Sequence, residues 1–311
     1  MEYRFLGQTG LQVSPLSLGT VGLGMDYGIQ APGVYGRPGE SEARRLILAA
    51  ADAGINFFDT ARAYGVSEEI LGKTLADKPY CYVATKISLP KKETRDKNHI
   101  KQIIKNSLQE SQRMLQRKVL DIVQIHNATT ATFKDGRVIE ALKQAKMEGK
   151  IRYIGASVYG EDAALIAIES GTIDTLQIAY SLVDQRAKNH VLPAAQNAGV
   201  GVMARSILLK GALTPKARYL PSHLRSLVEA AERVRKAFDV SWDELPQLAI
   251  RFCMGISEID VLILGISSKK ELDEALKAID AGPLSNREME QMREFGLDDE
   301  QLLNPSYWGI P

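Results

Sequence analysis

The chain has 311 residues, of which 45% are hydrophobic and 25% charged, and its formal net charge is +1. This composition is typical of a globular protein, and the near-neutral charge argues against nucleic acid or an acidic membrane as a partner, because both usually bind basic surfaces. No apolar run is as long as a membrane helix, and the N-terminus lacks the pattern of a signal peptide. Cys81 and Cys253 lie in apolar runs, so we interpret them as buried thiols of a cytoplasmic protein.

Short β-type runs alternate with amphipathic stretches along nearly the whole chain. We predict strands at residues 15–18, 56–59, 80–85, 120–126, 153–156, 175–179, 201–204 and 261–264. Eight strands separated by helices, without a Pro/Gly/Ser-rich linker, predict one α/β domain over residues 1–311, built as a closed (β/α)8 TIM barrel. A doubly wound open sheet is the alternative fold.

Additional elements are predicted outside the eight repeats. Residues 4–13, with Gln8-Thr9-Gly10 at the centre, predict an N-terminal β-hairpin that plugs the bottom of the barrel, and residues 286–295 predict an extra C-terminal helix. The outer helices include residues 42–53, 67–76 and 98–117. Residues 21–39, 89–98 and 209–222 and a tail with Tyr307 and Trp308 are expected to overhang the face that carries the chemistry.

Four polar residues lie at or just beyond the ends of predicted strands: Asp59, Tyr64, Lys86 and His126. In a barrel of parallel strands these ends meet on one face, where the active sites of that architecture are found. A lysine in such a place needs a partner, since a bare buried ammonium is very costly, and Asp59 can provide it. An ammonium next to the Tyr64 phenol would lower its pKa towards neutral pH and make it a better general acid. His126 would orient or polarise a substrate oxygen.

Other chemistries find less support in the sequence. No set of His, Cys, Asp and Glu has the spacing of metal ligands, so we expect no metal. Residues 19–24 contain three glycines but read GxxGxG, with no helix directly after Gly24, so they do not match the Rossmann fingerprint. We interpret them as part of a loop over a pocket.

Two segments resemble the signatures of the aldo-keto reductase superfamily. Gly54–Gly65 is similar to the first signature and Gly149–Ser157 to the second, and the likeness extends from about Tyr3 to the helix after Ser268. The resemblance implies a (β/α)8 barrel that binds an extended nicotinamide cofactor without a Rossmann domain. It also implies that Asp59, Tyr64, Lys86 and His126 form a catalytic tetrad with Tyr64 as the proton donor.

The same resemblance implies a set of cofactor contacts. Ser157 and Gln177 would hold the nicotinamide carboxamide, and Arg205 aligns with the residue that commonly stacks an aromatic ring on the nicotinamide. At the position after Ser157 the family normally has Asn, and this chain has Val158. The full set implied by the resemblance is Gly19, Thr20, Asp59, Ser157, Gln177, Arg205, Ser206, Leu208, Lys210, Gly265, Ser267, Ser268, Lys269, Lys270 and Glu274.

Cofactor choice depends on the residues after the eighth strand. Where the family has Lys and Arg, this chain has Gly265 and Glu271, and where the family has Asn it has Ala275. That leaves Lys269 and Lys270 to meet a 2′-phosphate. A phosphate at this helix N-terminus is physically reasonable, because free N–H groups attract anions. The family's habit therefore favours NADP(H) over NAD(H), with solvated surface lysines as the alternative interpretation.

The sequence predicts reversible hydride transfer between nicotinamide and a carbonyl or alcohol, with an aldehyde, ketone or sugar as the small-molecule substrate. A catalytically weak, cofactor-sensing regulatory protein on the same fold is the first alternative. A carboxylate-based hydrolase is the second, although no pair of carboxylates at strand ends supports it. The oligomeric state and the individual substrate cannot be read from the sequence.

Overall fold

Eight parallel strands form a closed barrel in the computed structural model, which describes residues 1–33, 35–89 and 97–310. The strands follow chain order around the barrel, and the last pairs with the first. They are β3 (Leu16–Gly19), β4 (Phe57–Asp59), β5 (Tyr82–Ser88), β6 (Leu120–Ala128), β7 (Ile151–Val158), β8 (Thr175–Ala179), β9 (Gly201–Arg205) and β10 (Val261–Gly265). The predicted (β/α)8 barrel is confirmed, and the open sheet is excluded.

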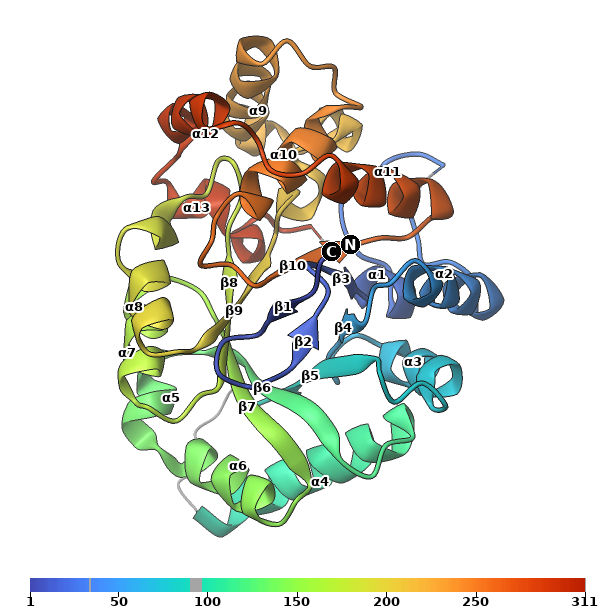
Figure 1. The fold of residues 1–311 in the computed structure, drawn as a ribbon, viewed down its shortest axis with the longest axis vertical. Coiled ribbons are helices and arrows are strands. Elements are labelled where there is room, and N and C mark those ends of the chain that lie inside the picture. The colour runs from blue at the N-terminus through green and yellow to red at the C-terminus, as the bar shows by residue number, and fades with distance from the viewer. Residues whose placement is uncertain (34, 90–96, 311) are drawn as a thin grey trace.

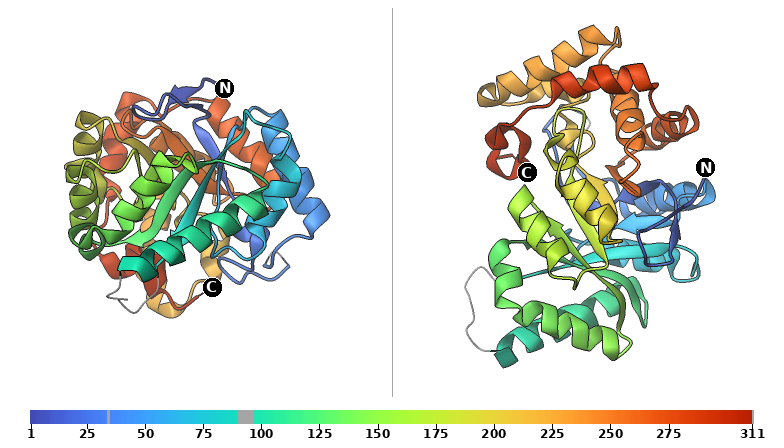
Figure 2. Two further views of the ribbon diagram at one scale, coloured as in Figure 1. Left: turned by 90° about the horizontal axis from the view of Figure 1, so that it is seen from below. Right: turned by 60° about the vertical axis from the view of Figure 1, so that its left-hand side comes forward.

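Helices surround the strands on all sides, as Figure 1 shows. They are α1 (Val21–Gly24), α2 (Glu40–Asp52), α3 (Ser67–Leu75), α4 (Lys97–Leu115), α5 (Thr130–Asp135), α6 (Arg137–Met147), α7 (Glu161–Glu169), α8 (Val191–Asn197), α9 (Arg225–Ala237), α10 (Leu245–Met254), α11 (Lys269–Asp280), α12 (Asn286–Met292) and α13 (Glu300–Leu303). Figure 2 shows α4 and α6 on one side of the barrel and α9 and α12 on the opposite side. The extra C-terminal helix is confirmed as α12, which continues into a 3-10 turn at Arg293–Phe295.

The N-terminal hairpin consists of β1 (Arg4–Phe5) and β2 (Gln12–Val13), paired antiparallel. Its apolar side chains join residues from inside the barrel in one buried cluster. The cluster contains Leu6, Leu11, Val13, Phe57, Ala84, Ile122, Met203, Val261 and Ile263. Since Phe57 and Val261 begin their strands, the hairpin closes the N-terminal end of the barrel, as predicted, and leaves the opposite end for the chemistry.

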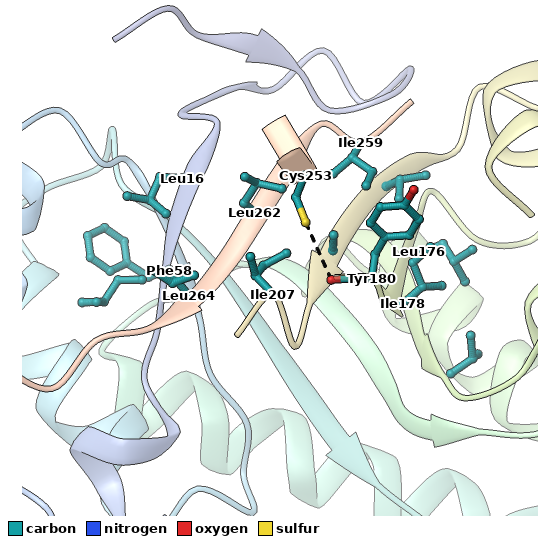
Figure 3. Packing of buried hydrophobic residues seen from close by; sticks show 14 of the residues in the cluster. Leu16, Phe58, Leu176, Ile178, Tyr180, Ile207, Cys253, Ile259, Leu262 and Leu264 are labelled. Atoms are coloured by element: carbon teal, nitrogen blue, oxygen red, sulfur yellow. Dashed lines mark hydrogen bonds between the residues drawn. The ribbon is translucent and has the colours of Figure 1, made fainter. Parts of the chain in front are cut away.

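The larger part of the core lies between the outer faces of the strands and the helices. Figure 3 shows this packing where Leu262 lies beside Cys253 of α10, whose thiol approaches the carbonyl oxygen of Tyr180 at 4.0 Å. Cys81 and Cys253 are both buried and unpaired, which confirms that they are buried thiols. Burial raises the pKa of Cys81 to about 11, so this thiol is unreactive at neutral pH.

The loops at the C-terminal end of the barrel contain more structure than we expected. The segment 209–222 forms short 3-10 helices at Leu209–Gly211 and Pro215–Tyr219, with a further one at Ser222–Leu224. The tail also has a turn, at Pro305–Tyr307. Of the loop predicted at 89–98, residues 90–96 lie outside the described part of the chain. None of the helices described is long and apolar enough to cross a membrane.

Candidate active site

The four predicted catalytic residues come together at the C-terminal end of three neighbouring strands. Asp59 ends β4, Lys86 and His126 lie near the ends of β5 and β6, and Tyr64 follows β4 in the loop that leads to α3. The register places Lys86 beside Gln124 and Ser88 beside His126, so the ends of β5 and β6 are level.

Lys86 is fully buried and paired with Asp59. Its Nζ lies 2.7 Å from each carboxylate oxygen of Asp59 and donates a further hydrogen bond of 3.0 Å to the carbonyl oxygen of Thr60. Burial lowers the pKa of Lys86, and Asp59 opposes that effect. The contact with Asp59 that we predicted from the sequence is therefore present. Removing one partner would leave an uncompensated buried charge, which typically costs about 3–5 kcal/mol.

Tyr64 lies between the ammonium group and the histidine. The Nζ of Lys86 is 5.0 Å from the centroid of the Tyr64 ring, and the His126 ring lies 5.8 Å away and nearly perpendicular to it. Burial and the nearby Asp59 raise the pKa of Tyr64 above its ordinary value. The expected lowering of the Tyr64 pKa is therefore not found, because burial has the largest effect and the charge of Asp59 adds to it. Tyr64 therefore holds its proton at neutral pH.

His126 is neutral at physiological pH. Burial, followed by the positive charge of Lys86, lowers its pKa to about 4. A neutral imidazole has one N–H donor and one acceptor nitrogen, so it can donate a hydrogen bond without carrying a charge.

Asp59 also connects this group of residues to Ser157 and Gln177. The side-chain amide of Gln177 donates a 2.8 Å hydrogen bond to Asp59, and its carbonyl oxygen accepts one of 3.3 Å from Ser157. The amide of Gln124 donates to the same Asp59 oxygen at 3.3 Å. Gln124 was not among the predicted residues. A polar side chain two residues before His126, in an otherwise apolar strand, is the pattern that could have indicated it.

Two glycines allow the loop of Tyr64 to pack closely against α1. A Cβ atom on Gly24 would lie 2.0 Å from the carbonyl oxygen of Tyr64, and one on Gly65 would lie 2.3 Å from that of Gly24. Gly65 also has a φ of 56°, which favours glycine. The predicted flexible loop therefore begins with a short helix held tightly against the Tyr64 segment.

Buried polar contacts hold the same loop from the other side. Glu68 accepts hydrogen bonds of 2.6 Å from Arg62 and from the hydroxyl group of Thr85 on β5. The hydroxyl of Ser67 lies 2.5 Å from that of Thr20 at the end of β3. Tyr64 is thus positioned by contacts to two strands.

A cavity of about 830 Å³ opens beside Tyr64 and reaches the start of α11. Most of the predicted site residues line it. They are Gly19, Thr20, Asp59, Tyr64, His126, Ser157, Gln177, Arg205, Ser206, Leu208, Lys210, Gly265, Ser267, Ser268, Lys270 and Glu274. Lys86 lies behind Asp59, and Lys269 pairs with Asp273, so neither belongs to the described residues that line the cavity.

Several lining residues were not predicted. Tyr159 follows the end of β7, and Asn127 is the last but one residue of β6. Lys216 and Arg218 come from the 3-10 helix at Pro215–Tyr219. Lys216 forms an ion pair with Glu271 at 3.3 Å. The expectation that only Lys269 and Lys270 bring positive charge to α11 is therefore wrong. Lys216 and Glu271 are 55 positions apart, so no local pattern in the sequence could predict their contact.

Arg205 lies over the ring of Tyr159. The central carbon of its guanidinium group is 3.9 Å from the centroid of that ring, and one of its nitrogens donates a 3.0 Å hydrogen bond to the carbonyl oxygen of Val158. The Val158 side chain is buried, so this residue contributes only its backbone oxygen to the contact with Arg205. Arg205 and Tyr159 thus form a cation–π pair in the wall of the cavity.

Lys210 connects two loops that border the cavity. Its Nζ donates a 2.8 Å hydrogen bond to the carbonyl oxygen of Ile310 in the tail and lies 4.8 Å from the centroid of the Tyr27 ring. Burial lowers its pKa to about 8. No group of acidic, histidine or cysteine residues suited to a metal ion occurs among the residues described, and the site is built from proton carriers and hydrogen-bonding groups.

Several known proteins are similar in sequence to this chain. The L-galactose dehydrogenase of Arabidopsis thaliana is 29% identical, over 97% of this chain and 92% of its own length. An NADH-specific methylglyoxal reductase of Escherichia coli is 29% identical over 93% and 97%, and a probable voltage-gated potassium channel subunit beta of Oryza sativa is 26% identical over 99% and 100%.

A solved structure extends the likeness to three dimensions. The aldo-keto reductase from Bacillus halodurans in its holo form superposes with a TM-score of 0.78 at 26% identity, and the match covers 98% of this chain and all of that one. The family model described as the Aldo/keto reductase family matches residues 15–296, which include every strand of the barrel. With this match over nearly its whole length, the chain belongs to the aldo/keto reductase family.

Proposed function

We propose that this protein interconverts a carbonyl and an alcohol, with Tyr64 as the proton donor in reduction and the proton acceptor in oxidation. Membership of the family makes it a nicotinamide-dependent oxidoreductase. The observation that carries the residue assignment is the cavity into which Tyr64 and His126 open together with Ser157 and Gln177. No other group of described residues combines proton carriers with carboxamide-binding side chains in this way.

Each residue would have a distinct role in the reaction. A bound nicotinamide supplies the hydride in reduction or accepts it in oxidation. Tyr64 protonates the substrate oxygen, and the neutral His126 donates a hydrogen bond to the same oxygen while negative charge develops there. Lys86 keeps a positive charge behind Tyr64, and Asp59 fixes its position.

The residues present fit an extended dinucleotide. Ser157 and Gln177 offer a hydroxyl and an amide at the Tyr64 end of the cavity, and these groups can bind a carboxamide as donors and acceptors. At the other end Gly265 leaves open space, since nothing lies within 4 Å of an added Cβ atom. Arg205 would lie beside the nicotinamide, and Ser206, Leu208 and Lys210 along the middle of the cofactor.

The substrate would be a small carbonyl compound or a sugar. Tyr27, Asn127 and Tyr159 line the cavity along with Ser306 and Gly309 of the tail, so aromatic faces and polar groups occur together. The relative named L-galactose dehydrogenase supports a polyhydroxylated substrate. We also propose a cytoplasmic location, which two unpaired thiols support.

A regulatory, cofactor-sensing role is the second candidate. It is favoured by the relative named as a potassium channel subunit beta. The complete set of Asp59, Tyr64, Lys86 and His126 favours catalysis, because a protein that only senses a cofactor does not need a proton donor at the cavity. Nicotinamide absorbance assays with aldehydes, ketones and aldoses, in both directions and with both cofactors, distinguish the two functions.

The change Tyr64→Phe tests the assignment. It removes the phenolic hydroxyl and keeps the ring that packs near Lys86 and His126, so turnover should fall by a factor of about 10²–10⁴, which is the usual contribution of a general acid. Cofactor affinity, measured by fluorescence titration, should stay within about twofold. Tyr80→Phe is the matched control, since the Tyr80 side chain is exposed and outside the cavity. A Tyr64→Phe enzyme with wild-type turnover would refute the role of Tyr64.

A further inference from the structure

We infer that Glu271 makes this protein select NAD(H) over NADP(H), by occupying the position that a 2′-phosphate would need. This inference rests on the proposed function, because it concerns how the same cavity holds the adenosine end of the cofactor. It also reverses the preference for NADP(H) that the sequence suggested.

Glu271 lies in the first turn of α11, and its carboxylate accepts hydrogen bonds from nearby groups that could otherwise bind an anion. One of its carboxylate oxygens accepts hydrogen bonds from the backbone N–H of Ser267 at 2.8 Å and from the Ser267 hydroxyl at 2.9 Å. Its other oxygen accepts one from Lys216 at 3.3 Å. The N-terminus of a helix and a nearby ammonium are groups that would otherwise attract a phosphate. Here the N–H and hydroxyl of Ser267, just before the helix, and the ammonium of Lys216 are already bound to a carboxylate of the protein.

The remaining cations near α11 are also balanced by acidic side chains. Lys269 pairs with Asp273 outside the cavity, and Lys270 is 79% exposed and lies 3.8 Å from Glu274. Glu274 lines the cavity together with Glu271, so two carboxylates face the space next to the helix. A phosphate group there would carry about two negative charges and meet two more, an arrangement that weakens binding because like charges repel.

The same carboxylate suits a ribose that carries no phosphate. An ionised carboxylate is an acceptor only, and it can accept hydrogen bonds from the ribose hydroxyl groups. Acidic side chains perform this role for the 2′-hydroxyl of NAD in dinucleotide-binding folds of another kind. Arg218 also lines the cavity and could meet the diphosphate in the middle of the cofactor.

Equilibrium binding tests this inference without relying on turnover. Fluorescence titration of the wild-type protein with NADH and with NADPH should give a dissociation constant at least about tenfold lower for NADH. In Glu271→Gln the amide oxygen can still accept the hydrogen bonds from Ser267, but the charge is gone. Affinity for NADPH should then rise about tenfold, while affinity for NADH changes much less.

Asp273→Asn is the matched control, because it removes one negative charge from the same helix at a position outside the cavity. It should leave the ratio of the two dissociation constants unchanged. Equal affinity of the wild-type protein for NADH and NADPH, or an unchanged ratio in Glu271→Gln, would overturn the inference and leave the proposed function intact. If neither cofactor binds, the proposed function fails and the inference fails with it.

Discussion

Tyr64 and His126 are held in opposite protonation states by the same burial. Burial raises the pKa of the phenol and lowers that of the imidazole to about 4, so above about pH 5 the pair consists of a protonated tyrosine and a neutral histidine. Both can then donate a hydrogen bond to one substrate oxygen. In the proposed role, the two groups would meet a carbonyl oxygen without any change of charge near neutral pH.

Arg205 should influence which redox state of the cofactor binds more tightly. Its guanidinium group would lie beside the nicotinamide, which is positively charged when oxidised and neutral when reduced. Because like charges a few ångströms apart repel even in a polar environment, Arg205 disfavours the oxidised form. The change Arg205→Tyr should therefore lower the ratio of the dissociation constants for oxidised and reduced cofactor, by about tenfold.

Titration of both redox states into both proteins measures this ratio. Lys270→Gln is the matched control, since it removes a positive charge from the far end of the same cavity. If Arg205→Tyr and Lys270→Gln leave the ratio equally unaffected, the guanidinium does not lie near the ring.

At the scale of elements, sequence patterns predicted strands well where they are apolar and less well where chemistry begins. The strand predicted at 80–85 is observed at Tyr82–Ser88, because backbone pairing continues through the polar Lys86 and Ser88. The strand predicted at 153–156 extends over Ile151–Val158 for the same reason, since it includes Arg152 and Ser157. Local patterns mark the apolar part of a strand, whereas hydrogen bonds to its neighbours decide where it ends.

Contacts between distant elements were beyond the reach of such patterns. The pair of Asp59 and Lys86 could be predicted, because both lie near the C-terminal ends of strands and opposite charges attract. The hydrogen bond from Gln177 to Asp59 and the ion pair of Lys216 with Glu271 depend on how whole elements pack. For that reason the sequence could place Asp59 beside Lys86 but could not show that Lys216 brings positive charge next to α11.

Asp260, which binds the N-terminal hairpin, should make the free energy of unfolding depend on pH. Asp260, just before β10, accepts hydrogen bonds from the N–H groups of Gly7 in the hairpin and Val202 in β9. Burial nevertheless raises the pKa of Asp260 to about 6. The folded state therefore binds a proton more readily than the unfolded state, whose pKa is near 3.8. Stability from this group is present at low pH and is lost as the pH rises through about 6.

Asp260→Asn should remove this contribution, because an amide oxygen can accept both hydrogen bonds but does not titrate. Denaturant unfolding at several pH values gives the free energy of unfolding of both proteins. As the pH rises from about 4 to about 7, the free energy of unfolding of the variant should increase relative to that of the wild type. Above that range the difference between the two proteins should be constant. A difference that does not change with pH would show that Asp260 has the same pKa in the folded and unfolded states.

At the scale of the whole molecule, the cavity is lined by segments from nearly the full length of the chain. Gly19 ends β3, Ser157 and Gln177 belong to β7 and β8, and Glu274 lies in α11, while the tail contributes Ser306. The hairpin closes one end of the barrel, and the cavity lies among these segments, which are far apart in the chain. A bound dinucleotide would connect them.

Cofactor binding should therefore raise the thermal stability of the entire protein. A ligand at 100 times its dissociation constant stabilises the folded state by about 2.7 kcal/mol. For a domain of this size that corresponds to an increase in Tm of about 5 °C.

Thermal unfolding of the protein with NADH should show this shift, and AMP at the same concentration should produce a much smaller one, because it can reach only the α11 end of the cavity. Tyr64→Phe should keep the full shift with NADH, since the phenolic hydroxyl is needed for proton transfer and not for binding. If AMP alone stabilised the protein as much as NADH does, the Ser157 and Gln177 end of the cavity would not be holding the nicotinamide.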